Sequence, residues 1–151
     1  SLHVHTLEHP FSIVIQFTHM VFEGVLVRFP KLRCAFLEAG CGWLPYMMDR
    51  MDEEMEKPYR VQAPMLKKKP SELIRNGQIW TTCEVEEKAL PHVVEQFNPK
   101  CLMWPSDYPH ERLPDMFSHD LPEFFGRTDI GDDTRKAILH DNPIDFYRLK
   151  I

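Results

Sequence analysis

The sequence contains no hydrophobic run that approaches the roughly 20 residues of a membrane-spanning helix. It also lacks a basic stripe alternating with aromatic residues, and its formal charge is −5, from 18 basic and 23 acidic residues. The first residues have neither the basic nor the apolar region of a signal peptide. We therefore expect neither a membrane nor a nucleic acid among the partners of this protein.

Cysteine is scarce, and its spacing is irregular. The four cysteines are Cys34, Cys41, Cys83 and Cys101, and no two of them have the C-x-x-C spacing of a zinc knuckle or redox motif. Three lie in or beside expected strands, so we interpret them as small buried residues rather than as a disulfide framework. This use of cysteine is typical of a reducing compartment, and we expect a cytoplasmic protein.

What is present fits one folded domain, which we expect to span residues 1–151. The apolar content is 43% and the charged content is 27%, as in ordinary globular proteins. A chain of 151 residues is long enough to bury a core of its own.

Short β-rich segments alternate with helical ones along the chain. Strands are expected at residues 33–38, 78–83 and 101–104, where β-forming and apolar residues are bounded by turn residues. Residues 43–55 and 86–97 have helical periodicity and follow the first two strands. Strands that alternate with helices predict an α/β fold with a parallel sheet.

Helical segments are also expected at both ends of the chain. The first begins near Ser12 and places Phe17 and Val21 on one stripe. Near the other end, an aspartate caps a helix through His140, and Asn142-Pro143 starts another helix.

Each expected strand is followed by an acid: Glu38, Glu84 and Asp107. Because parallel strands end on the same side of a sheet, the three carboxylates are expected to converge there, where α/β enzymes place their chemistry. Taken alone, Asp107 could equally begin a turn or cap a helix. The repetition of the arrangement favours a site.

Two other features leave alternatives open. His3 and His5 would share one face of a strand and could ligate a metal, or they belong to an irregular, solvated terminus with His9. The run Lys67–Lys69, within the long connection 57–77, is either a solvated face or an anion-binding segment.

Four stretches of the chain resemble the carboxyl-terminal part of the amidohydrolase-related metal-dependent hydrolases, the Amidohydro_2 family, which are relatives of aminocarboxymuconate-semialdehyde decarboxylase. They are Gly24-Val-Leu-Val-Arg-Phe-Pro-Lys-Leu-Arg33 running into Phe36-Leu-Glu-Ala-Gly-Cys-Gly-Trp43, Pro45-Tyr-Met-Met-Asp-Arg-Met-Asp52, Trp104-Pro-Ser-Asp-Tyr-Pro-His110 and Ile138-Leu-His-Asp-Asn-Pro143. Their order and spacing both fit, over nearly the whole chain.

The resemblance implies the carboxyl-terminal portion of a TIM-like (β/α)₈ barrel, with about three parallel βα units preceded by a helix. It implies that Asp107 binds a divalent metal, zinc or manganese, and serves as acid and base. Glu38, Trp43 and His110 would line the mouth that holds the substrate. His3-Val4-His5 imitates the family's first-strand histidine pair but lies next to the region of its fifth helix, so the first four to five βα units have no counterpart here.

These inferences favour a metal-dependent hydrolase or non-oxidative decarboxylase acting on a small cyclic or aromatic carboxylate. An open half-barrel exposes a sheet edge and an inner face. We therefore expect either a fragment of a longer protein or a chain that associates, for example as a homo-oligomer. Two alternatives are an incomplete barrel that serves as an interaction domain and a small-molecule binding module that uses the loop Gly40–Gly42 and the lysine run.

Overall fold

A three-stranded parallel sheet in the order β1-β2-β3 forms the centre of the fold. The computed structural model describes residues 1–107 and 117–151. The strands are β1 (Cys34–Phe36), β2 (Ile79–Thr82) and β3 (Leu102–Met103), each shorter than predicted. In the register, Phe36 lies beside Thr81, and Thr82 lies beside Met103.

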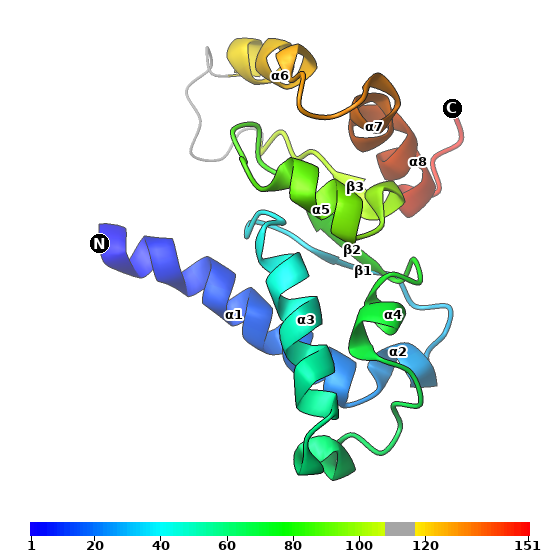
Figure 1. Cartoon of the computed structure of the whole chain (residues 1–151). Helices are drawn as coiled ribbons and strands as arrows, with labels where there is room; N and C mark the ends of the chain where they lie inside the picture. The colour runs from blue at the N-terminus through cyan, green and yellow to red at the C-terminus, as the bar shows by residue number, and fades with distance from the viewer. Residues whose placement is uncertain (108–116) are drawn as a thin grey trace.

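Helices precede, separate and follow the strands (Figure 1). Up to β2 they are α1 (Leu2–Phe22), α2 (Val25–Arg28), α3 (Trp43–Met55), the 3₁₀ helix η1 (Pro58–Gln62) and α4 (Pro70–Ile74). After β2 they are α5 (Leu90–Gln96), the 3₁₀ helix η2 (Pro99–Cys101), α6 (Phe117–Gly126), α7 (Asp132–Lys136), the π-helical segment η3 (Ala137–Asp141) and α8 (Asn142–Tyr147). The predicted arrangement of about three parallel βα units preceded by a helix is confirmed.

Helix α1 begins much earlier than the sequence suggested. It is a continuous helix from Leu2, so the expected start near Ser12 and the irregular terminus before it are both wrong. The side chain of Ser1 accepts a hydrogen bond from the backbone N–H of Val4 and caps the helix. Pro10 lies inside the helix, where it cannot donate the usual bond to the preceding turn. We expected the start near Ser12 because the helical spacing of apolar residues begins there and serine is a common N-cap.

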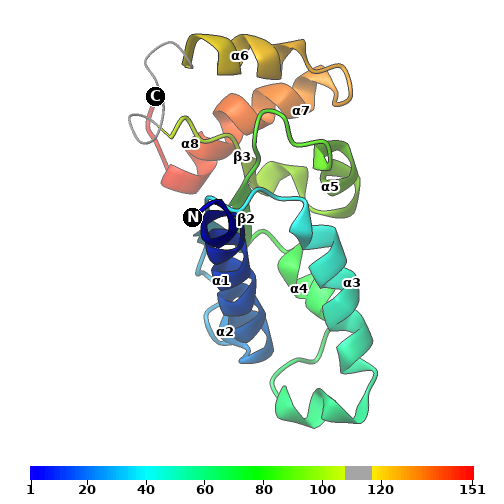
Figure 2. The same cartoon turned by 90° about the vertical axis from the view of Figure 1, so that its left-hand side faces the viewer.

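Helices lie on both faces of the sheet (Figure 2). On one face, the ring of Phe36 packs 5.3 Å from that of Phe17 in α1, and Trp43 of α3 completes an aromatic cluster. Trp80 is the register partner of Ala35 and points to the other face, because side chains alternate along a strand. There its ring lies 5.1 Å from Phe146 of α8. Strands β2 and β3 are thus buried between two helical layers, and β1, at the edge of the sheet, is half-buried.

The carboxyl-terminal helices continue through the predicted break at Asn142-Pro143. Because Pro143 has no N–H to donate, the helix widens there, and the N–H of Asn142 donates to the carbonyl of Ala137, five residues back. The side-chain amide of Asn142 donates to the carbonyls of Pro99 and Leu102, at 2.8 and 2.7 Å. This contact fastens the helices to β3.

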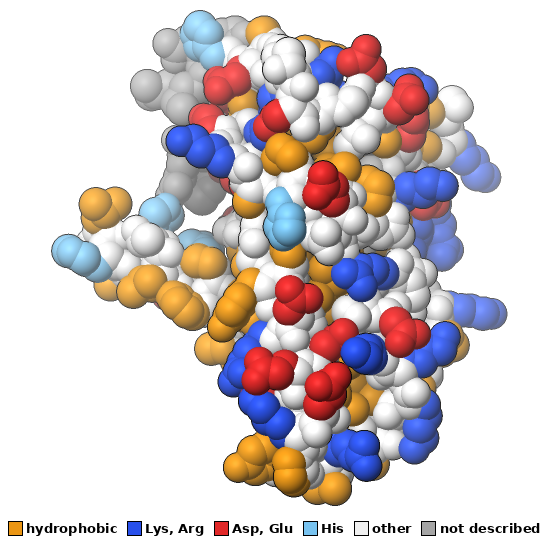
Figure 3. All heavy atoms as spheres, viewed as in Figure 1, with side chains coloured by type: hydrophobic (Ala, Val, Ile, Leu, Met, Phe, Trp, Pro, Cys, Tyr) orange, Lys and Arg blue, Asp and Glu red, His pale blue; other side chains and the backbone are white. Residues whose placement is uncertain are grey.

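The first half of α1 projects from the body and carries an apolar surface (Figures 1 and 3). The most exposed large apolar side chains of α1, each more than half exposed, are Leu2, Val4, Leu7, Phe11 and Ile15. Val4, Leu7, Phe11 and Ile15 are spaced three or four residues apart and share one face of the helix, and we call these four residues the α1 stripe. In the described part of the chain, no helix has the length and apolar character needed to cross a membrane.

Candidate active site

The three post-strand acids lie at the carboxyl edge of the sheet, as their positions predict. Glu38 follows β1, Glu84 follows β2 and Asp107 follows β3. Glu38 and Glu84 line one open hollow of about 450 Å³, whereas Asp107 is not among the described residues that line it. The other residues lining the hollow are Pro10, Ala39, Gly40, Glu86 and Glu87.

Two of these acids have strained backbones. Glu38 has a φ of 65° and Asp107 a φ of 53°, in the left-handed region that residues with a Cβ seldom adopt. Holding a side chain in this conformation costs about 1–3 kcal/mol, and such residues cluster at functional sites. Arg148, at the end of α8, also adopts it, with a φ of 54°. The strain at both strand ends supports a functional edge of the sheet.

A buried hydroxyl at this edge lacks a hydrogen-bond partner in the part of the chain that the structure describes. Thr82, the last residue of β2, is 4% exposed, and its Oγ1 has no hydrogen-bond partner among the described residues. Such an orphaned group costs about 1–3 kcal/mol. The sequence could not predict this feature of Thr82, because threonine is an ordinary residue of β-strands.

The carboxylate of Glu87 joins the loops that follow β1 and β2. Its Oε1 accepts the backbone N–H groups of Cys41 and Gly42, at 2.8 and 2.6 Å, which lie at the amino end of α3. Its Oε2 accepts the N–H of Glu84 at 3.1 Å and the thiol of Cys41 at 3.2 Å. The free N–H groups at the start of a helix attract an anion, and here the anion belongs to the chain itself.

The glycines of the loop 40–42 permit this close approach. A Cβ on Gly40, whose φ is +60°, would lie 2.8 Å from Oε1 of Glu87, and one on Gly42 would lie 3.1 Å from the same atom. This loop was expected to let the backbone approach a ligand closely, and in the structure a side chain of the same chain lies there instead. The group that approaches is Glu87, so the N–H groups of Cys41 and Gly42 are not free to hold an external ligand.

Arg127, which is distant in sequence, binds backbone carbonyls of the loop after β2. Its guanidinium donates to the carbonyls of Val85 and Glu87, at 2.7 and 3.0 Å. It also pairs with Asp129 at 2.6 Å, and this hydrogen bond lowers the pKa of the Asp129 carboxyl. Neither Glu87 nor Arg127 was predicted, because nothing in the sequence connects them to a strand end.

The buried thiols beside Glu87 are held in their neutral form. Burial, and secondarily the negative charge of Glu87, raises the pKa of Cys83 to about 12 and raises the pKa of Cys41 still further. Thiols with raised pKa values are poor nucleophiles and poor metal ligands. All four cysteines are free, and all but Cys34 are buried, as predicted.

Trp43 and His110 were expected to line the mouth of the site. The indole ring of Trp43 is half-buried, packs at 5.0 Å on Phe17 and donates its N–H to the carbonyl of Gly40 at 3.0 Å. Its structural role is therefore established, and contact with a substrate stays a prediction. His110 lies outside the described residues.

His3 and His5 lie in α1 rather than in a strand. Residues two apart in a helix point about 200° from each other, so the argument that the two rings share one face does not hold. The ring of His5 instead lies 5.6 Å from that of His9, and Nδ1 of His9 lies 3.6 Å from Oε2 of Glu38. His9 thus contacts a strand-end acid. His5 and His9 are four residues apart, and this spacing would have predicted the contact between their rings if a helix had been expected here.

The residues that the structure describes do not complete a metal site. Within residues 1–107 and 117–151, no group of three or more His, Cys, Asp or Glu side chains is arranged to hold a metal ion. A catalytic zinc usually takes three protein ligands. Asp107 therefore needs further ligands before it can serve in such a site.

Comparison with known proteins supports the fold. No curated protein matches the chain significantly. An amidohydrolase from Mycobacterium avium subsp. paratuberculosis K-10 is similar in structure, with 23% identity, a TM-score of 0.68 and coverage of 94% of this chain and 34% of that one. The 5-carboxyvanillate decarboxylase LigW from Sphingomonas paucimobilis gives 24% identity, a TM-score of 0.69 and coverage of 88% and 38%.

A third solved structure contains a metal. The dihydroxybenzoic acid decarboxylase from Polaromonas sp. JS666, with bound manganese and the inhibitor 2-nitroresorcinol, gives 19% identity, a TM-score of 0.70 and coverage of 90% of this chain and 40% of that one. The chain thus spans only 34–40% of the length of these three structures. Its fold is the carboxyl-terminal portion of a TIM-like (β/α)₈ barrel.

A sequence profile of the Amidohydro_2 family, described as amidohydrolase, matches residues 3–149. This match extends over nearly the whole chain and agrees with the three parallel strands and their helices. The chain belongs to the Amidohydro_2 family of amidohydrolases.

Proposed function

We propose that the protein acts in the non-oxidative decarboxylation of a small aromatic or cyclic carboxylate. The observation that carries the proposal is the position of Asp107, in strained left-handed backbone just past β3, on the edge of the sheet where Glu38 and Glu84 also lie. Decarboxylation is proposed first because two of the similar structures are decarboxylases, and the amidohydrolase among the similar structures keeps hydrolysis open. Hydrolysis by the same edge of the sheet is the second candidate.

In decarboxylation, the bond between the ring carbon and the carboxylate breaks and CO₂ leaves. The electron pair of that bond stays on the ring carbon, which then takes up a proton. Asp107 is proposed to hold and transfer this proton, the role of a positioned general acid. Glu38, Trp43 and His110 are proposed to contact the substrate.

A divalent metal, zinc or manganese, is proposed as the cofactor because the family implies one. When bound, it would polarise the substrate and stabilise developing negative charge. Asp107 is the proposed ligand among the described residues. The histidine pair His3 and His5 remains a weaker proposal, because the helix separates the two rings.

Association is proposed to cover the exposed apolar surface. The α1 stripe is an unpartnered apolar row, and in the described residues β1 pairs only with β2, so its other edge is open. Contiguous exposed apolar patches and open sheet edges are typical of interaction surfaces. A second copy of the chain is the proposed partner.

The reaction is tested on purified protein supplied with Mn²⁺ or Zn²⁺. Release of CO₂ from dihydroxybenzoic acid and 5-carboxyvanillate is followed together with the bound metal. We expect turnover to fall by about 10²-fold or more in Asp107→Asn, since the proton donor is lost. Asp133→Asn, which changes an exposed acid of α7, is the control and should keep full turnover.

Three results would decide against this proposal. Equal rates in Asp107→Asn and wild type would remove Asp107 from the chemistry. Hydrolysis of cyclic amides or lactones without CO₂ release would select the second candidate. No metal and no turnover with either class would mean that the chain is an incomplete barrel, either an interaction domain or part of a longer protein that carries the activity.

A further inference from the structure

The segment 57–69, between α3 and α4, is the most basic part of the chain. Its 13 residues contain five Lys or Arg and no Asp or Glu, in a protein whose formal charge is −5. The five are Lys57, Arg60, Lys67, Lys68 and Lys69. The sequence left open whether the lysine run is a solvated face or an anion-binding segment. The proposed active site does not include these lysines.

The structure folds this segment around a hollow of about 440 Å³ beside the end of α3. Four of the five cations line it. Lys57 does not, and its ammonium pairs with Glu53 and Glu54, both at 2.9 Å. The apolar part of the lining includes Met55, Val61 and Leu66. A volume of roughly 300–1,000 Å³ is usual for a small-molecule site.

Positive charge exceeds negative charge around the hollow. The four cations Arg60, Lys67, Lys68 and Lys69 face two carboxylates, Asp52 and Glu56, an excess of two positive charges (4 − 2). Asp52 is engaged elsewhere, because its oxygens accept the N–H and O–H of Ser71 at 2.9 and 2.7 Å. Glu56 lies 3.6 Å from Lys69.

Among the described residues, three of the four cations, Arg60, Lys67 and Lys68, are without a local counter-charge. Within residues 1–107 and 117–151, no ion pair engages Arg60 or Lys68. The ammonium of Lys67 donates to the carbonyl of Pro64 at 3.0 Å, which leaves its charge unbalanced. Uncompensated like charges around one hollow repel one another, and an anion would relieve this repulsion.

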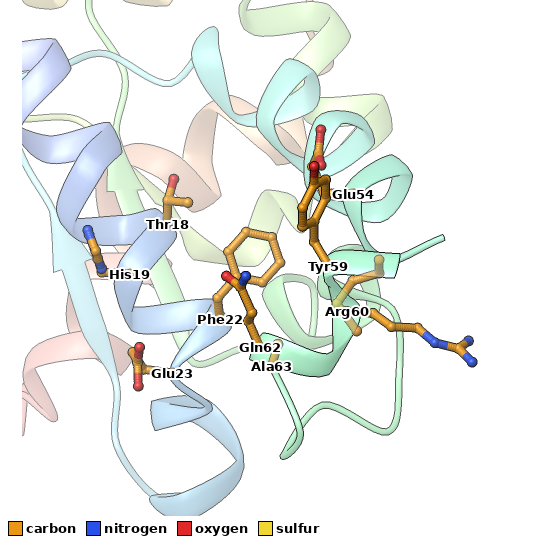
Figure 4. Close-up of a pocket in the computed structure, with 10 residues that line it drawn as sticks. Thr18, His19, Phe22, Glu23, Glu54, Tyr59, Arg60, Gln62 and Ala63 are labelled. Carbon is orange, nitrogen blue, oxygen red and sulfur yellow. The ribbon is translucent and has the colours of Figure 1, made fainter. Parts of the chain in front are cut away.

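A neighbouring hollow of about 330 Å³, between α1 and η1, is different (Figure 4). Its lining is of mixed charge, with Glu23 and Glu54 opposed to His19 and Arg60. Glu54 already pairs with Arg50 and Lys57, and the side chain of Arg60 points away from this hollow in Figure 4. The hollow beside Lys67–Lys69 thus carries four cations, whereas a third hollow, after α2, is lined by two, Arg28 and Lys31.

We propose that the basic hollow binds a small soluble anion that carries phosphoryl groups. Lysine ammonium groups and the arginine fork are the usual protein partners of phosphate, and the apolar wall suits an organic body. The site is separate from the strand-end acids: α3 begins at the loop held by Glu87 and ends at the hollow, and its 13 residues span about 20 Å.

Calorimetric titration with pyrophosphate at low ionic strength tests this site. We expect one binding event per chain that weakens as salt is added. Arg60→Gln/Lys67→Gln/Lys68→Gln should raise Kd by about tenfold or more, since three phosphate-facing charges are lost. Lys31→Gln/Lys100→Gln/Lys150→Gln removes the same charge from exposed lysines elsewhere and should leave Kd within about twofold.

Circular dichroism of both triple variants ensures that each is folded before titration. Equal weakening in the two variants would show a nonspecific effect of net charge and overturn the proposal. Absence of pyrophosphate binding to the wild type would also overturn it. Binding to phosphatidylcholine vesicles that contain phosphatidylinositol phosphate, without binding to pyrophosphate, would replace the soluble anion by a lipid surface.

Discussion

At the scale of single residues, the carboxylate of Glu87 holds together the loops of the candidate active site, although Glu87 does not directly follow a strand. Glu87 accepts three backbone N–H groups from two loops, and each is a donor that would otherwise need another partner. The sequence singled out Glu38, Glu84 and Asp107 because they directly follow strands. It could not single out Glu87, because the role of that residue depends on the loop after β1 folding against it.

Removing this carboxylate should destabilise the protein. Glu87→Ala leaves the N–H groups of Cys41, Gly42 and Glu84 without their acceptor, and we expect the free energy of unfolding to fall by about 2–3 kcal/mol. Urea denaturation followed by circular dichroism measures it. Glu86→Ala, at the adjacent exposed position, should change stability by less than about 0.5 kcal/mol. Equal losses in the two variants would contradict the role assigned to Glu87.

At the scale of elements, periodicity predicted the existence of the helices and strands better than their limits. The three strands and the helix 43–55 are present, because strand and helix patterns of apolar residues are local signals. Asn142-Pro143 was expected to begin a new helix, but Pro143 lies within a helix that widens to accommodate it. Whether a helix continues past a proline depends on which neighbouring groups satisfy the freed carbonyl, and the sequence does not show that.

The fastening of the last helices to β3 can be tested at Asn142. This residue is 5% exposed, and its amide donates to two backbone carbonyls. Asn142→Ala should lower the free energy of unfolding by about 1–3 kcal/mol. Asn142→Asp should cost more, because it places a carboxylate against those carbonyls.

The exposed neighbour Asp141 provides the control for this prediction. Its ion pairs with Lys136 and His140 are at the surface, and the bond to His140 holds the pKa of its carboxyl below the usual value. Surface pairs contribute little, so Asp141→Ala should leave the free energy of unfolding close to that of the wild type. An Asn142→Ala variant as stable as the Asp141→Ala variant would show that the amide is not a fastening contact.

At the scale of the whole molecule, the exposed α1 stripe has a consequence for association. Sedimentation velocity of the wild type should show mass that increases with protein concentration, because burying the stripe removes apolar surface from water. Leu7→Gln/Phe11→Gln should abolish this increase. The matched control is Phe125→Gln/Leu149→Gln, which changes equally exposed side chains elsewhere. Association that persists in the first variant and is lost in the second would place the interface outside α1.

The sequence by itself determined the class of the fold, the order of the βα units, the family and the three acids at strand ends. These depend on local periodicity, on motifs of several residues and on the geometric rule that parallel strands end on one side. Only the tertiary structure decided that Glu87 occupies the donors of the glycine loop, that His9 rather than His3 reaches Glu38, and that the basic segment encloses a hollow. Each of these joins residues distant in sequence, and such contacts are set by how the elements pack, which no local pattern records.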